Sequence, residues 1–333
     1  MDKREIIKLL GVSGLVFTIP QPITLFAQNN NHMDKKEFEA IIIGGSYAGL
    51  SAAMALGRSL RRTLVIDAGK PCNRQTPHSH NFLTQDGSTP KEISEIAKSQ
   101  VAKYDSIKFY DGLAVSGKRN NIGFEVTTSK GDVFTAKKLV LATGVKDLMP
   151  DIKGFTECWG ISVVHCPYCH GYEIRNKKTA IIAKGERAFH LASLVNNLTQ
   201  EITIITSGSK DFEVNQLEKL KQHDIKIIEK EISAIEHQNR QIEKIVFKDG
   251  STEYFESAYA DIPFEQNSNI PQELGCKISE NGHIEVNFMQ KTSEDGIFAC
   301  GDNSSMMRSV SMAVSSGTMT GAMVNHELSQ ENF

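Results

Sequence analysis

The chain has 333 residues, a formal net charge of −3 and 40% hydrophobic residues. This length exceeds that of one typical hydrophobic core, so we expect two domains. There is no basic tract that would indicate nucleic-acid binding and no apolar run long enough to span a membrane. We therefore expect no nucleic-acid partner and no stable membrane insertion. Six cysteines in a chain this long do not indicate a disulfide scaffold.

The segment 1–34 differs from the rest and resembles a signal peptide. A short basic start precedes a modestly apolar run from Ile6 to Ile19, and the small residue Ala27 suits the position before a cleavage point. The stretch KREIIK resembles the twin-arginine export motif, with Lys3 in place of the first arginine. We therefore expect export to the periplasm. The alternative is a cytoplasmic protein whose translation starts at Met33.

A regular βαβ pattern begins at Phe38. The stretch FEAIIIGG predicts a buried strand that ends in glycine, residues 46–60 predict a helix, and TLVIDAG predicts a second strand that ends at Asp67. KKLVLATG, which ends at Gly144, predicts another buried strand. A second βαβ pattern begins with a strand at Thr179–Ala183. Two such patterns predict an α/β fold with two parallel sheets.

The turn Gly44-Gly45-Ser46-Tyr47-Ala48-Gly49 is similar to the G-x-G-x-x-G dinucleotide-binding fingerprint. The first glycine of that fingerprint makes a tight turn, the second lets the backbone approach a pyrophosphate, and the third permits close packing of helix and strand. Ser46 replaces the second glycine here. Asp67 stands at the end of the second strand, where an acid that binds a ribose belongs. The strand, helix and acid together predict a dinucleotide site.

A further candidate cofactor contact lies near the C-terminus. Ile297–Cys300 predicts a strand that ends at Gly301-Asp302, and a helix of small residues follows from about Val310. A carboxylate at a strand end can accept a hydrogen bond from a ribityl hydroxyl. The start of a helix can face the flavin edge that gains negative charge on reduction. A Gly-Asp pair by itself is more commonly a simple capped turn.

The stretch HCPYCHGYE, residues 165–173, contains a C-x-x-C-H motif. Read literally, the motif is the attachment signature of a c-type haem. A C-x-x-C is also compatible with half of a zinc site or with a redox-active disulfide. The motif alone leaves these three interpretations open.

Four stretches occur in an order and spacing that resemble the thioredoxin reductase-like flavoproteins, a group of the pyridine nucleotide-disulfide oxidoreductases: IIIGGSYAGLSAA, LVLATGVKDLMPDIKGF, CPYCHGYE and TSEDGIFACGD. The resemblance covers about residues 38–330. It implies two Rossmann-like three-layer dinucleotide-binding domains, with the nucleotide domain inserted into the FAD domain. We expect the FAD domain at 35–149 and 264–333, and an NAD(P)-binding-like domain with the C-x-x-C at 150–263. A homodimer is the family expectation.

The resemblance also implies the site residues. Cys166 and Cys169 match the redox disulfide of the family, with Cys166 exchanging with the external partner and Cys169 facing the flavin. His170 follows at a position where its near-neutral pKa suits a proton shuttle. In this context haem and zinc are disfavoured, and we expect no metal. The expected cofactor-binding residues are Gly44, Gly45, Ser46, Ala48, Gly49, Asp67, Gly144, Gly185, Gly301, Asp302 and Ser311.

The sequence departs from that family in three places. The glycine motif of the inserted domain begins at Ala183 instead of glycine, and Lys184 crowds the turn. The following strand ends at 206–210 with Lys210 as its charge, where NADPH-dependent members have an arginine cluster for the 2′-phosphate. His170 replaces the family's aspartate. We therefore expect FAD as the cofactor and treat NAD(P)H as a doubtful donor. The departures resemble a branch that includes dithiol oxidases.

We interpret the remaining chemistry-bearing residues as structural. Cys72, Cys158 and Cys276 are isolated and Cys300 lies in an apolar strand, as buried free cysteines usually do. The His78-x-His80 pair could indicate a metal, but a polar loop is the preferred interpretation.

The sequence thus predicts an FAD-dependent thiol/disulfide oxidoreductase that moves electrons between FAD, the Cys166–Cys169 pair and an external partner, with NAD(P)H as the donor. The partner is a thioredoxin-like protein or a small-molecule dithiol or disulfide. Two alternatives stay open: an O₂-dependent dithiol oxidase that does not use NAD(P)H, and a non-catalytic flavin-binding redox sensor.

Overall fold

The computed structural model describes residues 37–209 and 211–333. The expectations for the N-terminal segment and for Lys210 lie outside these residues. The described residues form two α/β parts. We call residues 37–147 together with 264–333 the outer part, and residues 148–263 the inserted part.

The outer part is built on a seven-stranded sheet within the described residues. Its parallel strands are short and apolar, as expected for strands buried on both faces. In sheet order they are β3 (Ile107–Asp111), β2 (Thr63–Asp67), β1 (Glu37–Ile43), β6 (Val133–Leu141) and β17 (Ile297–Ala299). The antiparallel strands β5 (Phe124–Thr128) and β4 (Ala114–Arg119) continue from β6.

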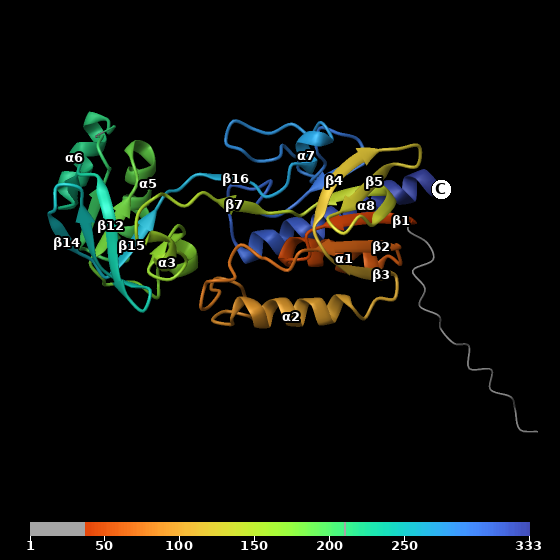
Figure 1. Cartoon of the computed structure of the whole chain (residues 1–333), viewed down its shortest axis with the longest axis horizontal. Coiled ribbons are helices and arrows are strands. Elements are labelled where there is room, and N and C mark those ends of the chain that lie inside the picture. The colour runs from red at the N-terminus through yellow and green to blue at the C-terminus, as the bar shows by residue number, and fades with distance from the viewer. Residues whose placement is uncertain (1–36, 210) are drawn as a thin grey trace, which may run out of the picture. The chain divides into compact units, whose positions relative to one another are not determined.

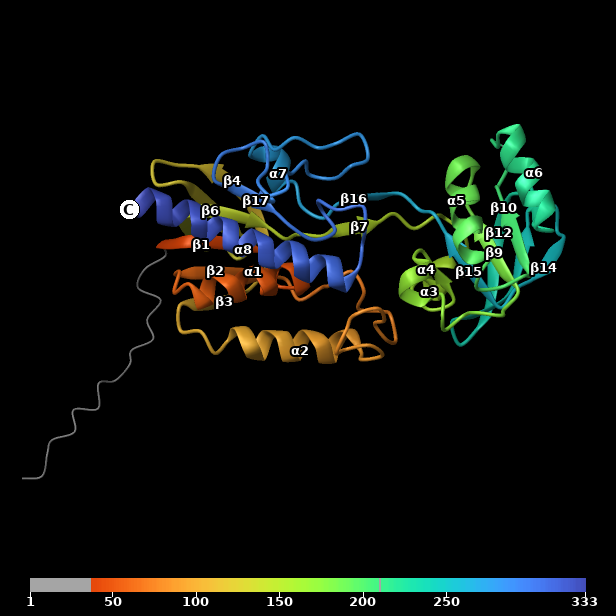
Figure 2. The same ribbon diagram turned by 180° about the vertical axis from the view of Figure 1, so that it is seen from behind.

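Helices cover one face of this sheet: α1 (Tyr47–Arg58), α2 (Pro90–Val101) and α8 (Val310–Asn332). The short helix α7 (Ile270–Glu273) packs on the other face. Both views show α8 running alongside α1 (Figures 1 and 2). The two helix backbones approach closely because α8 presents glycines to α1. A Cβ atom at Gly317 would lie 2.1 Å from the main-chain oxygen of Ala48, and one at Gly321 would lie 2.5 Å from that of Ala52.

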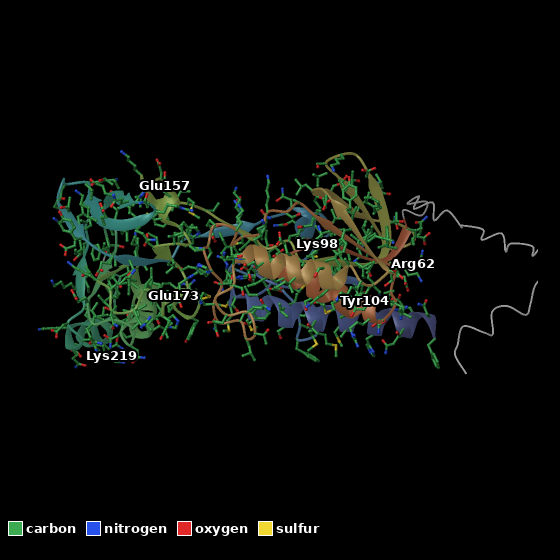
Figure 3. The ribbon with its side chains drawn as sticks, turned by 90° about the horizontal axis from the view of Figure 1, so that it is seen from below. Arg62, Lys98, Tyr104, Glu157, Glu173 and Lys219 are labelled. Atoms are coloured by element: carbon green, nitrogen blue, oxygen red, sulfur yellow. A yellow bond between two sulfur atoms is a disulfide. The ribbon has the colours of Figure 1, made fainter. Side chains whose placement is uncertain are left out.

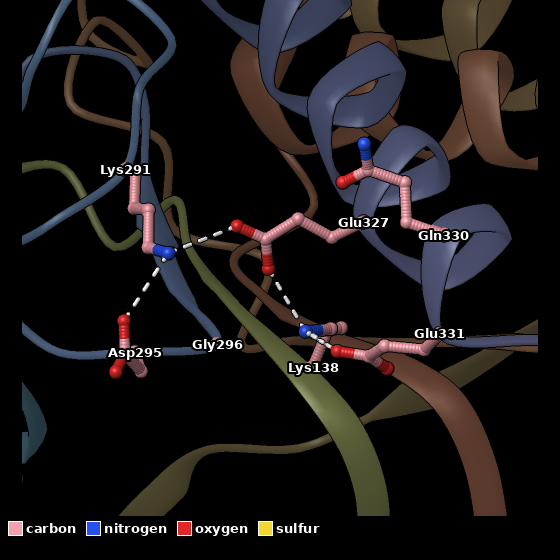
Figure 4. A pocket seen from close by; sticks show the side chains of 7 residues that line it. All are labelled: Lys138, Lys291, Asp295, Gly296, Glu327, Gln330 and Glu331. Atoms are coloured by element: carbon pink, nitrogen blue, oxygen red, sulfur yellow. Dashed lines mark hydrogen bonds and ion pairs between the residues drawn. The ribbon is translucent and has the colours of Figure 1, made fainter.

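An ion-pair cluster fixes the C-terminal end of α8 to the sheet and lines a pocket of about 460 Å³ (Figure 4). Lys138 of β6 bonds Glu327 at 2.8 Å and Glu331 at 2.5 Å, and Lys291 bonds Glu327 at 3.1 Å. Burial lowers the pKa of Lys138, but the two glutamates raise it by more, so the lysine stays charged. The charges that line this pocket are paired with one another, and the cluster has a structural role.

The inserted part has a five-stranded parallel sheet within the described residues. Its order is β11 (Lys226–Ile228), β10 (Ile202–Ile205), β9 (Thr179–Ile182), β15 (Ser257–Ala260) and β8 (Val163–Val164). One face packs against α5 (Gly185–Val195) and α6 (Val214–Gln222). The other face packs against an antiparallel sheet of β12 (Ile232–Gln238), β13 (Gln241–Phe247) and β14 (Thr252–Tyr254). The short helices α3 (Phe155–Cys158) and α4 (Pro167–His170) precede β9 in the chain.

Two antiparallel strands join the parts, β7 (Val145–Asp147) and β16 (Phe264–Gln266). After this second crossing, β17 and α8 return to the sheet and helices of the outer part. The α/β fold with one dinucleotide-type unit inserted into another is thus confirmed. The exact domain limits at 149/150 and 263/264 stay predictions. The first limit lies shortly after the end of β7, and the second lies immediately before the start of β16. Among the described residues, no helix has the length and apolarity needed to cross a membrane.

Candidate active site

The turn between β1 and α1 is too tight for side chains at its glycines. Gly44 has a φ of +105°, and a Cβ atom there would lie 2.1 Å from the main-chain oxygen of Ala142. A Cβ atom at Gly49 would lie 1.8 Å from the oxygen of Gly44. The main-chain N–H of Gly45 donates to Asp67 Oδ1 at 3.1 Å, which ties the turn to the end of β2. The structure therefore has the close approach that the fingerprint requires.

The N-terminus of α1 is free to face an anion. Ser46 is its N-cap, but the serine side chain makes no capping hydrogen bond, and no acidic residue stands in the first turn. The main-chain amides and the helix dipole therefore offer positive charge at this end. Such an arrangement fits the pyrophosphate of a dinucleotide.

Asp302 is the second residue of the outer part that we expect to face the cofactor. It follows β17 and Gly301, whose Cβ position lies 3.0 Å from the Cβ of Ala48, so this segment reaches the start of α1. Burial raises the pKa of the Asp302 carboxyl, and Arg308 Nε lies 3.6 Å from its Oδ2. A partly buried carboxylate with this single long ion pair among the described residues keeps acceptor capacity for a ribityl hydroxyl. These residues fit FAD.

Two other residues that we expect at the cofactor, Ser311 and Gly144, have local structural roles. Ser311 Oγ donates to the main-chain oxygen of Asn81 at 2.6 Å, so this hydroxyl fixes a loop to the start of α8. Gly144 has a φ of +65°, and nothing lies within 4 Å of its Cβ position, so the left-handed turn is what requires glycine there. Its role toward FAD stays a prediction, as do those of the other expected residues.

Cys166 and Cys169 form a disulfide at the start of α4, with Cα atoms 5.3 Å apart. Cys169 Sγ lies 3.9 Å from the main-chain oxygen of Arg308. Because a disulfide sulfur carries no proton, this is a van der Waals contact and not a hydrogen bond. Arg308 immediately precedes Ser309, the N-cap of α8. The sulfur pair of the inserted part therefore touches the segment that joins Asp302 to α8.

The two histidines that flank the C-x-x-C are uncharged at neutral pH. Burial lowers the pKa of His170 to about 4, and a positive charge on His80 adds to this effect. Burial also lowers the pKa of His165 to about 4, with Arg308 contributing. The expectation of a near-neutral pKa for His170 is thus wrong, because it took no account of how deeply packing covers the ring. A neutral imidazole next to Cys169 can still accept a proton.

Arg308 is a site residue that the sequence reasoning missed. Its guanidinium donates to Asp147 Oδ1 at 2.7 Å, and both side chains are almost fully buried. Its Nη2 lies 3.3 Å from Cys72 Sγ. Trp159 Nε1 donates to the other oxygen of Asp147 at 3.2 Å, and the Trp159 ring stacks on that of His165. A signal existed, since Arg308 is the only lysine or arginine after Lys291.

The free cysteines divide into two kinds. Cys158, Cys276 and Cys300 are buried, and burial raises the pKa of the Cys300 thiol to about 12, as expected for structural residues. Cys72 is only partly buried and contacts Arg308, so the interpretation of an isolated structural cysteine does not describe it. Burial raises the pKa of its thiol as well. Cys72 therefore stays protonated beside the site.

The equivalent turn in the inserted part, between β9 and α5, has a different surrounding. Gly185 has a φ of +48°, and the main-chain oxygen of Asp211 lies 2.7 Å from its Cβ position. Glu186 stands in the first turn of α5, and Gln216 Nε2 donates to its carboxylate. Arg187 pairs with Asp261 at 3.4 Å. The tight approach at Gly185 resembles that at Gly44, whereas the acidic residue in the first turn of α5 has no counterpart in α1.

The described residues contain no group of three or more His, Cys, Asp or Glu side chains that could hold a metal ion. His78 Nδ1 lies 2.9 Å from the main-chain oxygen of Gly87, and the His78 and His80 ring centroids are 6.4 Å apart. The two histidines therefore belong to an ordered loop, in agreement with the preferred interpretation.

Comparisons with known proteins agree with this geometry. The family model described as "Pyridine nucleotide-disulphide oxidoreductase" matches residues 38–317. "Thioredoxin reductase tcpT" of Claviceps purpurea is 32% identical over 304 residues, which cover 87% of this chain and 94% of that protein. Among solved structures, an oxidoreductase from Agrobacterium tumefaciens has a TM-score of 0.83 at 35% identity, covering 88% of this chain and 99% of that one. A putative thioredoxin reductase from Bacillus anthracis has a TM-score of 0.84 at 28% identity, covering 89% of this chain and 100% of that one.

The resemblance noted from the sequence motifs is therefore confirmed, and with it the assignment as an enzyme that uses FAD. The chain belongs to the pyridine nucleotide-disulfide oxidoreductase family and is a thioredoxin reductase-like flavoprotein within it.

Proposed function

We propose that the Cys166–Cys169 pair exchanges electrons with FAD on one side and with an external dithiol or disulfide on the other. The observation that carries this proposal is the contact of Cys169 Sγ with the main-chain oxygen of Arg308, 3.9 Å away, just before α8. Asp302 and the start of α8 are the groups that we expect at the flavin, so this contact supports electron exchange between the disulfide and the flavin. The same contact supports Cys169 as the flavin-side sulfur.

Cys166 is then the sulfur that reacts with the partner. In the direction of dithiol oxidation, a substrate thiolate attacks Cys166, the S–S bond breaks, and Cys169 leaves as a thiolate. The second substrate thiolate attacks the mixed disulfide and releases Cys166, so the substrate becomes a disulfide and the enzyme pair a dithiol. FAD, when bound, supplies or accepts the two electrons that restore the starting state. His170 takes up or returns the proton of the neighbouring sulfur.

The names of the relatives support a thioredoxin-like partner and NAD(P)H as the donor. One observation favours a second candidate, a dithiol oxidase that passes electrons to O₂ and does not use NAD(P)H. Glu186 puts negative charge in the first turn of α5. This charge would oppose the phosphates of a nicotinamide nucleotide.

Anaerobic stopped-flow spectroscopy separates these candidates. Rapid loss of flavin absorbance on mixing with NADPH or NADH supports the reductase. Loss of absorbance with 1,4-dithiothreitol but not with the nucleotides supports the dithiol oxidase, and admission of O₂ should then restore the absorbance. A protein whose flavin responds to neither reagent is a non-catalytic flavin protein, and that result would overturn the proposal.

We also propose that the N-terminal segment directs export and that the protein forms a homodimer. The first proposal is supported by the basic and apolar pattern of residues 1–28. N-terminal sequencing of the mature protein from periplasmic and cytoplasmic fractions tests it, and an intact Met1 or a start at Met33 in the cytoplasm would contradict it. Sedimentation of the purified holoprotein tests the second.

A further inference from the structure

We propose that Asp147 holds the redox disulfide at the position from which it exchanges electrons with the flavin. The Asp147 carboxylate does so by joining Arg308 of the outer part to Trp159 of the inserted part. The proposal rests on the proposed function, because it concerns electron transfer to and from that disulfide. Asp147 touches neither sulfur in the described contacts, so it is a positioning residue and not a catalytic residue.

The two carboxylate oxygens of Asp147 face donors from different parts of the molecule. Asp147 is the last residue of β7, one of the two strands that join the parts. Its Oδ1 accepts from Arg308 Nη1 at 2.7 Å, and its Oδ2 accepts from Trp159 Nε1 at 3.2 Å. The Asp147 side chain is 7% exposed and that of Arg308 is 13% exposed. Little water can therefore replace these bonds.

On the inserted side, Trp159 belongs to a group of stacked rings that ends next to the disulfide. The Trp159 ring stacks on those of Phe155 and His165, with centroid distances of 5.7 and 5.8 Å. His165 immediately precedes Cys166 in the chain. Its Nε2 atom is buried without a hydrogen-bond partner among the described residues. Stacking on Trp159 is therefore what holds the side chain that leads into the disulfide.

On the outer side, Arg308 connects Asp147 to the other sulfur. The main-chain oxygen of Arg308 lies 3.9 Å from Cys169 Sγ. Burial lowers the pKa of the Arg308 guanidinium, but Asp147 and its other neighbours raise the pKa by more, so the side chain keeps its charge. From Cys169 the covalent disulfide leads back to His165 and Trp159. The contacts therefore form a closed ring that includes both sulfurs.

Burial makes this ring of contacts sensitive to geometry. A buried ion pair offsets the cost of removing its charges from water only while the partner atoms stay in place. The exposed pair on the same two strands is different: Lys146 and Glu265 lie 2.8 Å apart and are 63% and 51% exposed, and such pairs contribute little. If the inserted part shifted relative to β7, Asp147 would lose its Trp159 donor. We therefore expect the buried bonds to favour one placement of the disulfide.

Another contact near α4 is less well protected from water. His80 Nδ1, in the loop between β2 and α2, lies 3.5 Å from Glu173 Oε1. Glu173 lies three residues after α4 (Figure 3), and its side chain is 38% exposed. Because water competes for such a contact, it fixes α4 less firmly than the buried bonds of Asp147 do.

The two halves of the proposed reaction depend on this placement to different degrees. When the Cys166–Cys169 dithiol is oxidised, two S–H bonds break and one S–S bond forms. Two electrons and one proton pass to FAD, and the second proton passes to solvent. This transfer needs a fixed sulfur position, and a displacement of about 1 Å can slow a reaction about 100-fold. A small dithiol diffuses to Cys166 wherever the inserted part lies, so its attack should not depend on Asp147.

The main test is Trp159→Phe, which keeps an aromatic ring and removes the donor to Asp147. The holoenzyme is mixed anaerobically with saturating 1,4-dithiothreitol, and the flavin absorbance is followed. We expect the limiting rate of flavin reduction to fall about 10-fold, the size of one hydrogen bond to a charged group. Lys146→Met, next to Asp147 on β7, is the matched control. Its rate should stay within about twofold of the unmodified protein, because its ion pair is exposed.

A chemical quench separates positioning from a general loss of structure. Samples are quenched during the same reaction, and the free thiols are alkylated with N-ethylmaleimide and counted by mass spectrometry. In Trp159→Phe, the thiols of Cys166 and Cys169 should appear as fast as in the unmodified protein and before the flavin loses its absorbance. The visible spectrum should show a normal FAD content.

A further readout does not depend on turnover. The chain has one tryptophan, so its indole N–H gives a single NMR signal in the oxidised holoenzyme. In Asp147→Asn this signal should shift upfield and the N–H should exchange faster with solvent, because the charged acceptor is lost. The signal should stay unchanged in Lys146→Met. If Trp159→Phe does not fold or loses FAD, Asp147→Asn carries the rate and quench measurements.

The outcomes separate this proposal from the proposed function. A flavin reduction rate in Trp159→Phe equal to that of Lys146→Met would overturn the positioning role alone. Equal slowing of thiol release and flavin reduction would show that Trp159 only supports the fold, and this would overturn the proposal too. An unaltered indole signal in Asp147→Asn would remove the bond on which it rests. If the flavin of the unmodified protein responds to neither dithiothreitol nor a nicotinamide nucleotide, the proposed function fails and the positioning role fails with it.

Discussion

The turn after β1 and the turn after β9 hold equivalent places in the two parts of the molecule, and they differ in charge. After β1, the N-terminus of α1 has no acidic residue in its first turn, and Asp67 binds the glycine turn from the neighbouring strand. After β9, Glu186 stands in the first turn of α5, and the Asp211 oxygen approaches Gly185. We therefore expect the same supersecondary structure to bind an anion in the first part and to oppose an anion in the second.

The difference teaches that the strand–turn–helix pattern specifies a fold but not a ligand. In the inserted part, the chemistry that we propose lies instead at α4, where Cys169 contacts the outer part. The five predictions that follow test this division of roles, in order of decreasing expected effect.

The largest effect is expected for Gly44→Ala. The new Cβ atom would lie 2.1 Å from the oxygen of Ala142, and the φ of +105° adds strain of about 1–2 kcal/mol. We expect the purified variant to contain no FAD, as judged by its visible spectrum. Gly131→Ala is the control, because its φ is +85° but nothing lies within 4 Å of its Cβ position. A Gly44→Ala protein with full flavin content would show that the turn is not the cofactor site.

Cys169→Ser should stop electron exchange while leaving the β1–α1 turn intact. We expect flavin reduction by dithiothreitol to slow by about 100-fold or more, because the variant lacks the flavin-side sulfur and cannot form the disulfide. The visible spectrum should show a normal FAD content. Cys276→Ala is the control, since this buried thiol lies in the outer part, away from α4. Unchanged flavin reduction in Cys169→Ser would remove α4 from the chemistry.

Acid should destabilise the region around α4. The pKa of His165 and that of His170 are about 4 in the folded protein against 6.5 for an ordinary histidine. Between these values the unfolded chain binds more protons, so the free energy of unfolding falls as the pH falls. We expect a loss of about 2 kcal/mol per histidine between pH 7 and pH 4. Urea unfolding measures it, and His170→Gln should lose less stability than the unmodified protein over this range.

Asp67→Asn should weaken FAD binding about 10-fold, because it removes the charge that we expect at a ribose and alters the acceptor for Gly45. The matched change in the inserted part is Thr206→Val, at the residue that follows β10. Thr206 Oγ1 is buried without a partner among the described residues, so this change should leave the FAD affinity and flavin reduction unaltered. Fluorescence titration of the apoprotein with FAD measures the FAD affinity of both variants. Equal losses in the two variants would contradict the comparison.

The smallest effect is expected for Glu186→Gln. Removing one negative charge from the first turn of α5 should lower the Kd for NADH or NADPH about threefold, which is the size of a helix-dipole contribution. Glu218→Gln on the exposed side of α6 is the control for charge alone. Isothermal titration of both variants measures the difference. If the two variants bind the nucleotides equally, the acid at α5 does not distinguish the turns.

Much of the fold was predictable from local patterns and from the family resemblance. The helix expected from about Val310 begins at Val310, and Asp67 ends β2 as expected, because apolar runs and glycine turns carry local information. The resemblance implied the insertion, which the return of β17 and α8 to the outer sheet confirms. The tightness of the Gly44 turn could also be anticipated, since only glycine fits such a position.

The rest of the site depends on contacts between distant residues. Arg308 and Asp147 are 161 residues apart, and no local periodicity pairs them. The contact of His80 with Glu173 also joins residues far apart in the sequence. The lowered pKa of His170 follows from burial, which only the packing of the folded chain determines. The sequence alone could identify candidate site residues, but it could not predict which residues lie next to them in the folded chain.

The position of α8 after the inserted part has a consequence for how the protein is made. The inserted sheet is complete once Ala260 has been synthesised, whereas the outer part still lacks β17, Asp302 and α8. Because α8 packs through its glycines against α1, the helix that we expect at the cofactor phosphates lacks this cover until α8 has been synthesised. The nascent chain can thus fold its inserted part first, and we expect FAD to be captured only once α8 is in place.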